Sequence, residues 1–168
     1  MKIERKWAMP NRWTFTIKPI REMLAREVSG GLWADPFCGE NSPAQIKNDL
    51  NPDNKFAQTH LDALDFLKSL PDNYVDGILF DPPYSPRQVS ECYKGFGKEV
   101  TNETTRCDFY SKLKNEMTRI CKSGGKIICF GWNSMGCGIN RGFEMTEILL
   151  VPHGGSKNDT ICTIEIKK

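Results

Sequence analysis

The sequence predicts an α/β fold in which helices cover both faces of a doubly wound, mostly parallel β-sheet. Strand-like apolar runs alternate with helical patterns along the chain, as they do in proteins of this class. The clearest run, Val75–Phe80 (VDGILF), predicts a buried strand of the central sheet. The chain has 168 residues, enough for one α/β domain and too few for two ordinary ones. We therefore expect residues 1–168 to form a single domain.

A helical spacing of apolar residues opens the N-terminal half. Ile20, Leu24 and Val28 recur every four residues, and Pro19 suits the first turn of a helix. This pattern predicts a helix over residues 17–28 that two following glycines end. The other elements predicted in this half are a short strand at 32–35, a weak strand at 45–49, a third at 55–59, and a helix at 63–70.

The C-terminal half begins with a polar stretch, residues 85–105, that shows no clear period, so we expect a long functional loop there. An apolar spacing of three to four residues then predicts a helix over 108–121. The remaining predicted elements are strands at 126–130, 143–151 and 160–166. In the last strand, Cys162, Ile164 and Ile166 form the apolar face of a period-two pattern. The last two strands suit an antiparallel hairpin at one edge of the sheet.

The composition is that of an ordinary soluble globular protein, and the formal net charge of +2 is close to neutral. This balance argues against a strongly basic coat protein for nucleic acid but permits a local basic patch. No apolar run is long enough to span a bilayer, and the N-terminus lacks the apolar core of a secretory signal. Seven cysteines without a Cys-x-x-Cys pair favour free thiols in a reduced cytoplasm. The two histidines lack ligand spacing, so we expect no metal site.

The tetrapeptide Asp81-Pro82-Pro83-Tyr84 follows directly on the predicted buried strand. The Asp81 carboxylate and the Pro82 carbonyl are two acceptors for the N–H groups of an aromatic amine, and the prolines stiffen the backbone. Tyr84 would stack on the base that carries the amine. An aromatic amine is a weak nucleophile because its lone pair is delocalised, so transfer to it depends mainly on positioning. We therefore interpret these four residues as catalytic.

Acidic residues also end two earlier predicted strands, those at 32–35 and 45–49. Asp35 begins the segment Asp35-Pro36-Phe37-Cys38-Gly39, and Asp49 ends the next strand. In open α/β sheets ligands bind beyond the carboxyl ends of strands. Asp35 could accept from a ligand ammonium, Gly39 allows close approach to the backbone, and Asp49 could accept from both hydroxyls of a ribose. Asp62 reads either as a further cofactor contact or as a helix N-cap.

Basic residues are mixed with aromatic ones in the stretch after the tetrapeptide. Arg87, Lys94 and Lys98 lie there with Tyr93 and Phe96 between them. This pattern is typical of a loop that tracks a nucleic-acid backbone and stacks bases, although a solvated loop with incidental charges fits it equally well. Near the N-terminus, Arg12 and its neighbouring tryptophans read either as core or as a lid.

Together, Lys18-Pro19, Asp35–Gly39 and Asp81–Tyr84 resemble segments of the S-adenosylmethionine-dependent amino-methyltransferases that modify adenine N6 or cytosine N4 in DNA. The run DPPYSPRQVSECYKGFG is similar to small phage and prophage adenine methyltransferases. The resemblance implies a Rossmann-like methyltransferase sheet that uses S-adenosylmethionine. It implies roles for three groups of residues: Ile17, Lys18, Pro19 and Asp35–Gly39 at the methionine end of the cofactor, Asp49, Asp62 and Ala63 at its ribose and adenine, and Asp81–Tyr84 in catalysis, with Asp81 also against the cofactor.

The resemblance further implies DNA as the substrate, with an adenine that is flipped out or single-stranded. An aspartate at the first clamp position favours adenine. The same chemistry on RNA or cytosine N4 is an alternative, and so is a non-catalytic subunit of this fold that binds nucleic acid or acts as a scaffold. The resemblance implies that the protein acts in the cytoplasm of a bacterium or of a phage-infected host cell. Restriction–modification is among its implied biological roles, and no membrane partner is implied.

The sequence departs from the family pattern in two places. Asn41 stands where the cofactor loop of the family usually has a second glycine. We also expect no separate target-recognition domain. Specificity would then come from residues 85–105 and 133–141, from a homodimer or a partner subunit, or would be low.

Overall fold

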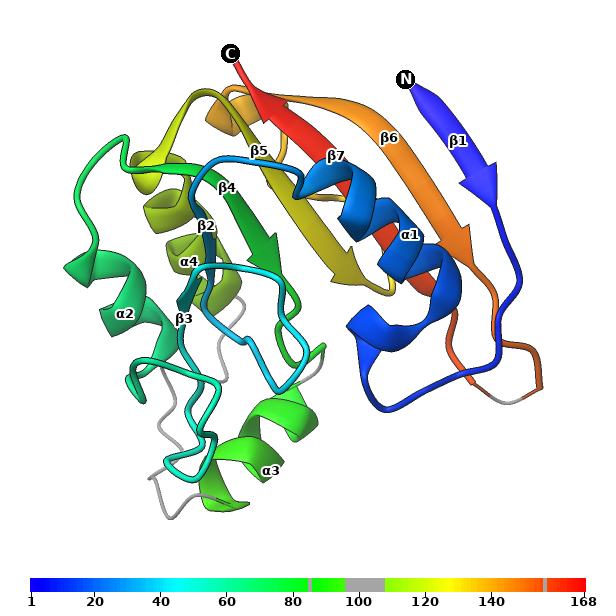
Figure 1. Ribbon diagram of the computed structural model, residues 1–168, viewed down its shortest axis with the longest axis horizontal. Coiled ribbons are helices and arrows are strands. Elements are labelled where there is room, and N and C mark those ends of the chain that lie inside the picture. Colours follow the sequence, from blue (N-terminus) through cyan, green and yellow to red (C-terminus); the bar gives the residue numbers. More distant parts are fainter. Residues whose placement is uncertain (85, 96–107, 156) are drawn as a thin grey trace.

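The computed structural model describes residues 1–84, 86–95, 108–155 and 157–168. These residues form a seven-stranded sheet with the strand order β1-β6-β7-β5-β4-β2-β3 (Figure 1). The elements in chain order are β1 (Lys2–Arg5), the 3₁₀ turn η1 (Thr14–Thr16), α1 (Lys18–Glu27), β2 (Trp33–Asp35), β3 (Ile46–Lys47), α2 (Ala63–Ser69), β4 (Val75–Phe80), α3 (Pro86–Gly95), α4 (Asp108–Ile120), β5 (Cys121–Gly131), the 3₁₀ turn η2 (Ile139–Arg141), β6 (Phe143–Val151) and β7 (Thr160–Lys167).

The sheet confirms the predicted fold class. Strands β3, β2, β4 and β5 run parallel to one another, and β7 lies antiparallel between β5 and β6. Beyond the predicted C-terminal pair, β1 adds a parallel strand at the outer edge of β6. Strand β1 was not predicted, because its four residues, KIER, are largely exposed and lack an apolar alternation.

Helices cover both faces of the sheet, with η1 and α1 on one face and α2 and α4 on the other (Figure 1). Ile20 of α1 belongs to the same buried cluster as Trp33 of β2, whereas Leu67 of α2 and Leu113 of α4 belong to the cluster on the opposite face. A glycine is needed at position 77, because a Cβ there would lie 2.4 Å from the indole ring of Trp33. These two buried clusters hold in place the strands whose ends form the candidate site.

The strand predicted at 55–59 is wrong. Carboxylate and amide oxygens of Asp49, Asn51 and Asn54 each accept from the backbone N–H two residues further on, which forms three successive turns. Contact with the sheet is limited to the end of the segment, where Thr59 forms an isolated bridge to Asn48 and the Gln58 N–H donates to the Lys47 carbonyl at 2.9 Å. Local side-chain hydrogen bonds therefore compete with strand formation in this segment.

The loop predicted over 85–105 is wrong for its first part, where α3 forms. Pro86 begins this helix, a position that tolerates its missing N–H, and Arg87 pairs with Glu91 one turn later at 2.7 Å. Residues 96–105 lie outside the described part of the chain.

The C-terminal strands also differ in detail from the prediction. β5 begins at Cys121 rather than at 126, and its register against β4 shifts between Val75 and Gly77. In β7, Thr163 and Glu165 are each 1% exposed, although the alternation predicted that they face away from the core. The Glu165 carboxylate is covered because it accepts from the backbone N–H groups of residues 137 and 138.

Candidate functional site

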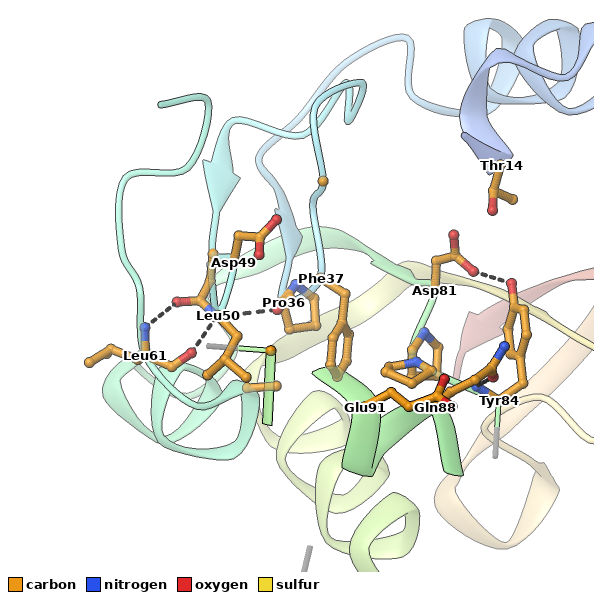
Figure 2. Close-up of a pocket in the computed structure, with 16 residues that line it drawn as sticks. Thr14, Pro36, Phe37, Asp49, Leu50, Leu61, Asp81, Tyr84, Gln88 and Glu91 are labelled. Atoms are coloured by element: carbon orange, nitrogen blue, oxygen red, sulfur yellow. Dashed lines mark hydrogen bonds between the residues drawn. The ribbon is translucent and has the colours of Figure 1, made fainter. Parts of the chain in front are cut away.

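The carboxyl ends of β2, β3 and β4 meet at one edge of the sheet because these strands run parallel. A cavity of about 560 Å³ opens there, and Figure 2 shows the side chains that line it. Asp49 lies at one end of the cavity and Asp81 with Tyr84 at the other, with Pro36 and Phe37 between them (Figure 2). The volume is in the range of small-molecule and cofactor sites.

Asp35, the last residue of β2, is fully buried. Its Oδ1 accepts from the backbone N–H of Phe37 at 2.9 Å, and its Oδ2 accepts from the hydroxyl of Ser42 at 2.6 Å. Burial raises the pKa of this carboxyl to about 7, although both hydrogen bonds oppose the shift. Asp35 thus shapes the turn out of β2. The direct contact with a ligand ammonium that we expected is not available to it, because protein encloses the side chain.

We expect Asp35→Asn to flatten the pH dependence of stability between about pH 4 and pH 7. The folded-state pKa lies above the unfolded value, so this carboxyl contributes most stability at low pH and loses it as the pH rises through about 7. Asparagine can accept from the Phe37 N–H and donate to Ser42 but does not titrate. In urea unfolding at pH 8 the variant should gain roughly a few kcal/mol relative to wild type, and at pH 4 almost nothing. Parallel pH curves for the two proteins would contradict this account.

The segment after Asp35 turns sharply at Gly39, whose φ of 51° favours glycine. Among the described residues, the non-glycine residue with a positive φ is Asn73. Asn41 therefore has a negative φ and does not adopt the conformation that favours glycine. The backbone thus accommodates the missing second glycine. Burial raises the pKa of the Cys38 thiol to about 12, so this thiol stays protonated and is a poor nucleophile.

Asn48 connects the segments under the cavity, and sequence reasoning missed it. The side chain is fully buried. Its Nδ2 donates to the carbonyls of Pro36 at 3.2 Å and Leu61 at 2.9 Å. Its Oδ1 accepts from the Leu61 N–H at 3.0 Å and the Thr59 hydroxyl at 2.8 Å. Asn48 thereby holds both walls of the cavity against the end of β3.

Asp49 is half-buried at the cavity end beyond β3. Its Oδ1 accepts from the Asn51 N–H at 2.9 Å and its Oδ2 from Asn54 Nδ2 at 2.6 Å. Asn54, also missed from the sequence, donates as well to the Gly39 carbonyl at 2.6 Å. Each Asp49 oxygen keeps a second lone pair for a ligand. The carboxylate is therefore held rigidly while it faces the cavity.

Asp62 forms the N-cap of α2, where its Oδ1 accepts from the Leu64 N–H at 2.9 Å. Its neighbours Leu61 and Ala63 line the cavity. The N-cap reading of Asp62 therefore holds, and its contact with the cofactor stays a prediction, as does that of Ala63.

The Asp81–Tyr84 loop is anchored by side chains from both flanking helices. Gln88 of α3 accepts from the Tyr84 N–H at 2.7 Å, and the Tyr110 hydroxyl of α4 donates to the Pro83 carbonyl. The sequence offered no signal for either anchor. In the described part of the chain no hydrogen bond reaches the Pro82 carbonyl, which is the second acceptor of the predicted clamp.

The other acceptor of the clamp is engaged within the protein, since the Tyr84 hydroxyl donates to Asp81 Oδ1 (Figure 2). Burial raises the pKa of Asp81, against the effect of hydrogen bonds from Tyr84 and Thr14. Burial also raises the pKa of Tyr84, which stays a neutral donor. The Tyr84 ring packs at 5.2 Å from that of Trp132. A substrate amine would have to replace the Tyr84 hydroxyl at Asp81.

The N-terminal segment places different residues at the site from those predicted. Thr14 of η1 lines the cavity, and its side chain faces Asp81 (Figure 2). Ile17 and Pro19 are buried, whereas Lys18 is exposed. In the described part of the chain, none of these three residues lines the cavity. Their contact with the methionine end of the cofactor therefore stays a prediction.

The predicted nucleic-acid residues lie on α3 or beyond it. The Arg87 side chain is 87% exposed and pairs with Glu91, which lines the cavity. Lys94 is exposed near the end of α3. Lys98 lies outside the described residues.

In the described ranges no group of three or more His, Cys, Asp and Glu side chains is arranged to hold a metal ion. No helix there has the length and apolarity needed to cross a membrane. Five cysteines are buried and free: Cys38, Cys121, Cys129, Cys137 and Cys162.

No protein-family model and no curated protein matches the sequence. Solved structures do match the fold. Over 90% of this chain it matches a 1,6-didemethyltoxoflavin-N1-methyltransferase from Burkholderia thailandensis, with a TM-score of 0.62, 10% identity and coverage of 77% of that chain. That structure contains 1,6-didemethyltoxoflavin and S-adenosylhomocysteine.

Two further structures show the same likeness. TrmN from Thermus thermophilus matches 94% of this chain with a TM-score of 0.58 and 16% identity, and this chain spans 50% of its length. The Escherichia coli protein yhhF matches 97% of this chain with a TM-score of 0.59 and 11% identity, over 92% of its own length. With the strand order, these likenesses define the fold as a Rossmann-like methyltransferase fold. At such identities they establish the fold alone.

Proposed function

We propose that this protein transfers a methyl group from S-adenosylmethionine to the N6 amine of adenine in DNA. One observation carries the proposal: a single cavity joins a rigid carboxylate, Asp49, to the Asp81–Tyr84 loop. A cofactor with a ribose at one end and a reactive sulfonium further along needs these two groups at opposite ends of one site. The fold supports the proposal, because the Burkholderia methyltransferase of like fold was solved with S-adenosylhomocysteine.

The cavity walls suit the parts of this cofactor. Asp49 would accept from the ribose hydroxyls, and the apolar side chains of Pro36, Leu50 and Leu61 would cover the adenine. Phe37 lies between Asp49 and Asp81 and would separate the ribose from the transfer point (Figure 2). The cofactor, when bound, supplies an electrophilic methyl group.

The chain's own residues would prepare the amine. Asp81 and the Pro82 carbonyl accept its two N–H groups, which holds the nitrogen in place and favours its lone pair for attack. Tyr84, once displaced from Asp81, is free to stack on the base. The raised pKa of Asp81 makes this carboxylate a suitable acceptor for the proton that the amine loses.

The proposal that DNA is the substrate rests on the position of the clamp and on basic residues near the cavity. A base within a duplex cannot reach a carboxylate at the end of a buried strand, so it must be flipped out or single-stranded. Arg87 and Lys94 are exposed on α3, the helix whose Gln88 and Glu91 line the cavity, and in this proposal they contact phosphates, although Glu91 neutralises Arg87 in part. DNA recognition would use these residues together with a second copy or a partner subunit.

We expect Asp49→Ala to weaken the binding of S-adenosylhomocysteine by about 1–3 kcal/mol, the usual value of a hydrogen bond to a charged group. Calorimetry measures this change directly. Asp53→Ala is the matched control, because Asp53 is an exposed carboxylate in the same loop that does not line the cavity. Equal affinities of the two variants would make Asp49 a purely structural residue.

Transfer of labelled methyl groups tests the proposal as a whole. The purified protein would be incubated with labelled S-adenosylmethionine and unmethylated duplex DNA, single-stranded DNA or RNA, and the products digested to nucleosides. We expect label in N6-methyladenine from DNA. Label in N4-methylcytosine or in RNA would move the proposal to those alternatives. Absence of label from a protein that binds the cofactor would favour the non-catalytic alternative.

A further inference from the structure

A second, smaller cavity of about 190 Å³ adjoins the main one. The two cavities share four lining residues, namely Thr14, Phe37, Gly39 and Asp81, so they lie next to each other. The other side of the small cavity is formed by Arg12 and Trp13 from the segment before η1. The sequence did not distinguish between a place in the core and a lid for these two residues.

Trp13 is fixed from three sides. Its backbone N–H donates to Asn11 Oδ1 at 3.0 Å, and its carbonyl accepts from the Thr16 hydroxyl at 2.8 Å. Its indole ring lies against Gly39, where an added Cβ would approach the ring at 4.0 Å. Trp13 is therefore a rigid platform that connects the N-terminal segment to the loop after β2.

Arg12 rests on this platform, with its guanidinium carbon 4.4 Å from the centre of the Trp13 ring. Stacking of this kind orients a guanidinium and leaves its N–H groups free to bind a carboxylate. Among the described residues no carboxylate forms an ion pair with Arg12, whereas Glu40 and Asp81 also line the small cavity. The cavity thus presents one free cation together with two acidic groups.

We propose that this cavity binds the zwitterionic amino-acid group of the cofactor, with Arg12 as the residue that contacts its α-carboxylate and Glu40 as the acidic residue near its ammonium. The assignment rests on the proposed function. The resemblance implied a contact of Lys18 with the methionine end, but Lys18 is exposed and lines neither cavity, whereas Arg12 lines the small one. The affinity for a ligand without the amino-acid group should therefore not depend on Arg12.

Two ligands separate this proposal from the proposed function. S-adenosylhomocysteine carries the amino-acid group, and 5′-methylthioadenosine keeps the adenosine but lacks that group. We expect Arg12→Met to raise the dissociation constant of S-adenosylhomocysteine about 10-fold or more, and that of 5′-methylthioadenosine less than about twofold. Arg21→Met is the matched control and should leave both constants within about twofold, because Arg21 is exposed and lines neither cavity. Lys18→Met tests the alternative that Lys18 contacts the amino-acid group. Arg12→Lys should fall between wild type and Arg12→Met, since it keeps the charge but not the planar group.

Equal losses for both ligands in Arg12→Met, no loss for either, or a selective loss in Lys18→Met would overturn the assignment of Arg12 while leaving the cofactor site itself intact. Failure of wild type to bind either ligand would overturn the proposed function together with this inference. Arg12 is exposed, so the variants should keep the wild-type melting temperature, which is measured alongside.

Discussion

Asp81→Ala is expected to abolish methyl transfer, with a loss of at least about 10²-fold, the usual effect of removing one preorganised electrostatic contact from an active site. Asp81 supplies the carboxylate of the clamp, and the Pro82 carbonyl alone would hold only one N–H group of the amine. The protein should remain folded, because burial raises the pKa of Asp81 and its charge therefore opposes folding at neutral pH. Steady-state transfer of labelled methyl to DNA measures the loss.

Asp65→Ala is the control for this variant, since Asp65 is an exposed carboxylate on α2 that does not line the cavity. It should transfer methyl groups at the wild-type rate. Binding of S-adenosylhomocysteine to Asp81→Ala should stay near wild type. Undiminished transfer by Asp81→Ala would exclude the clamp as the catalytic group.

The second large effect is expected on stability. Asn48→Ala should lower the free energy of unfolding by about 3 kcal/mol or more, because it leaves the buried Pro36 carbonyl without a partner and removes both hydrogen bonds to the backbone of Leu61. For a chain of this size such a loss corresponds to a fall of about 6–12 °C in melting temperature. Urea unfolding measures the free energy, and thermal unfolding measures the shift.

Asn115→Ala provides the comparison. Asn115 is exposed on α4 and accepts one hydrogen bond from Arg141 at 2.8 Å. Its replacement should cost less than about 1 kcal/mol. A similar cost for both variants would show that the Asn48 hydrogen bonds do not support the cavity walls.

The sequence predicted the parts of the molecule that local patterns determine. The VDGILF run, the spacing in α1 and α4 and the motif at Asp81–Tyr84 each lie within one short segment, so their structure follows from neighbouring residues. The order of strand ends then brings Asp49 and Asp81 to one cavity, as the rule for parallel sheets predicts.

Features that depend on distant contacts escaped the sequence. Tyr110 lies 27 residues from the carbonyl that it anchors, and no local pattern marks such a pair. Asp35 was interpreted as a ligand contact, but its side chain is fully buried and lines neither cavity. One signal was present for the missed asparagines, because the dense run of Asn and Asp over residues 48–54 is typical of turns built by side chains.

The most direct test of the account is a crystal structure of the protein with S-adenosylhomocysteine. We predict that the ribose hydroxyls lie within about 3 Å of the Asp49 carboxylate, and that the sulfur atom faces Asp81 and Tyr84. A ligand bound outside the cavity, or bound in it with the adenine at Asp81 and the amino-acid group at Asp49, would contradict the account.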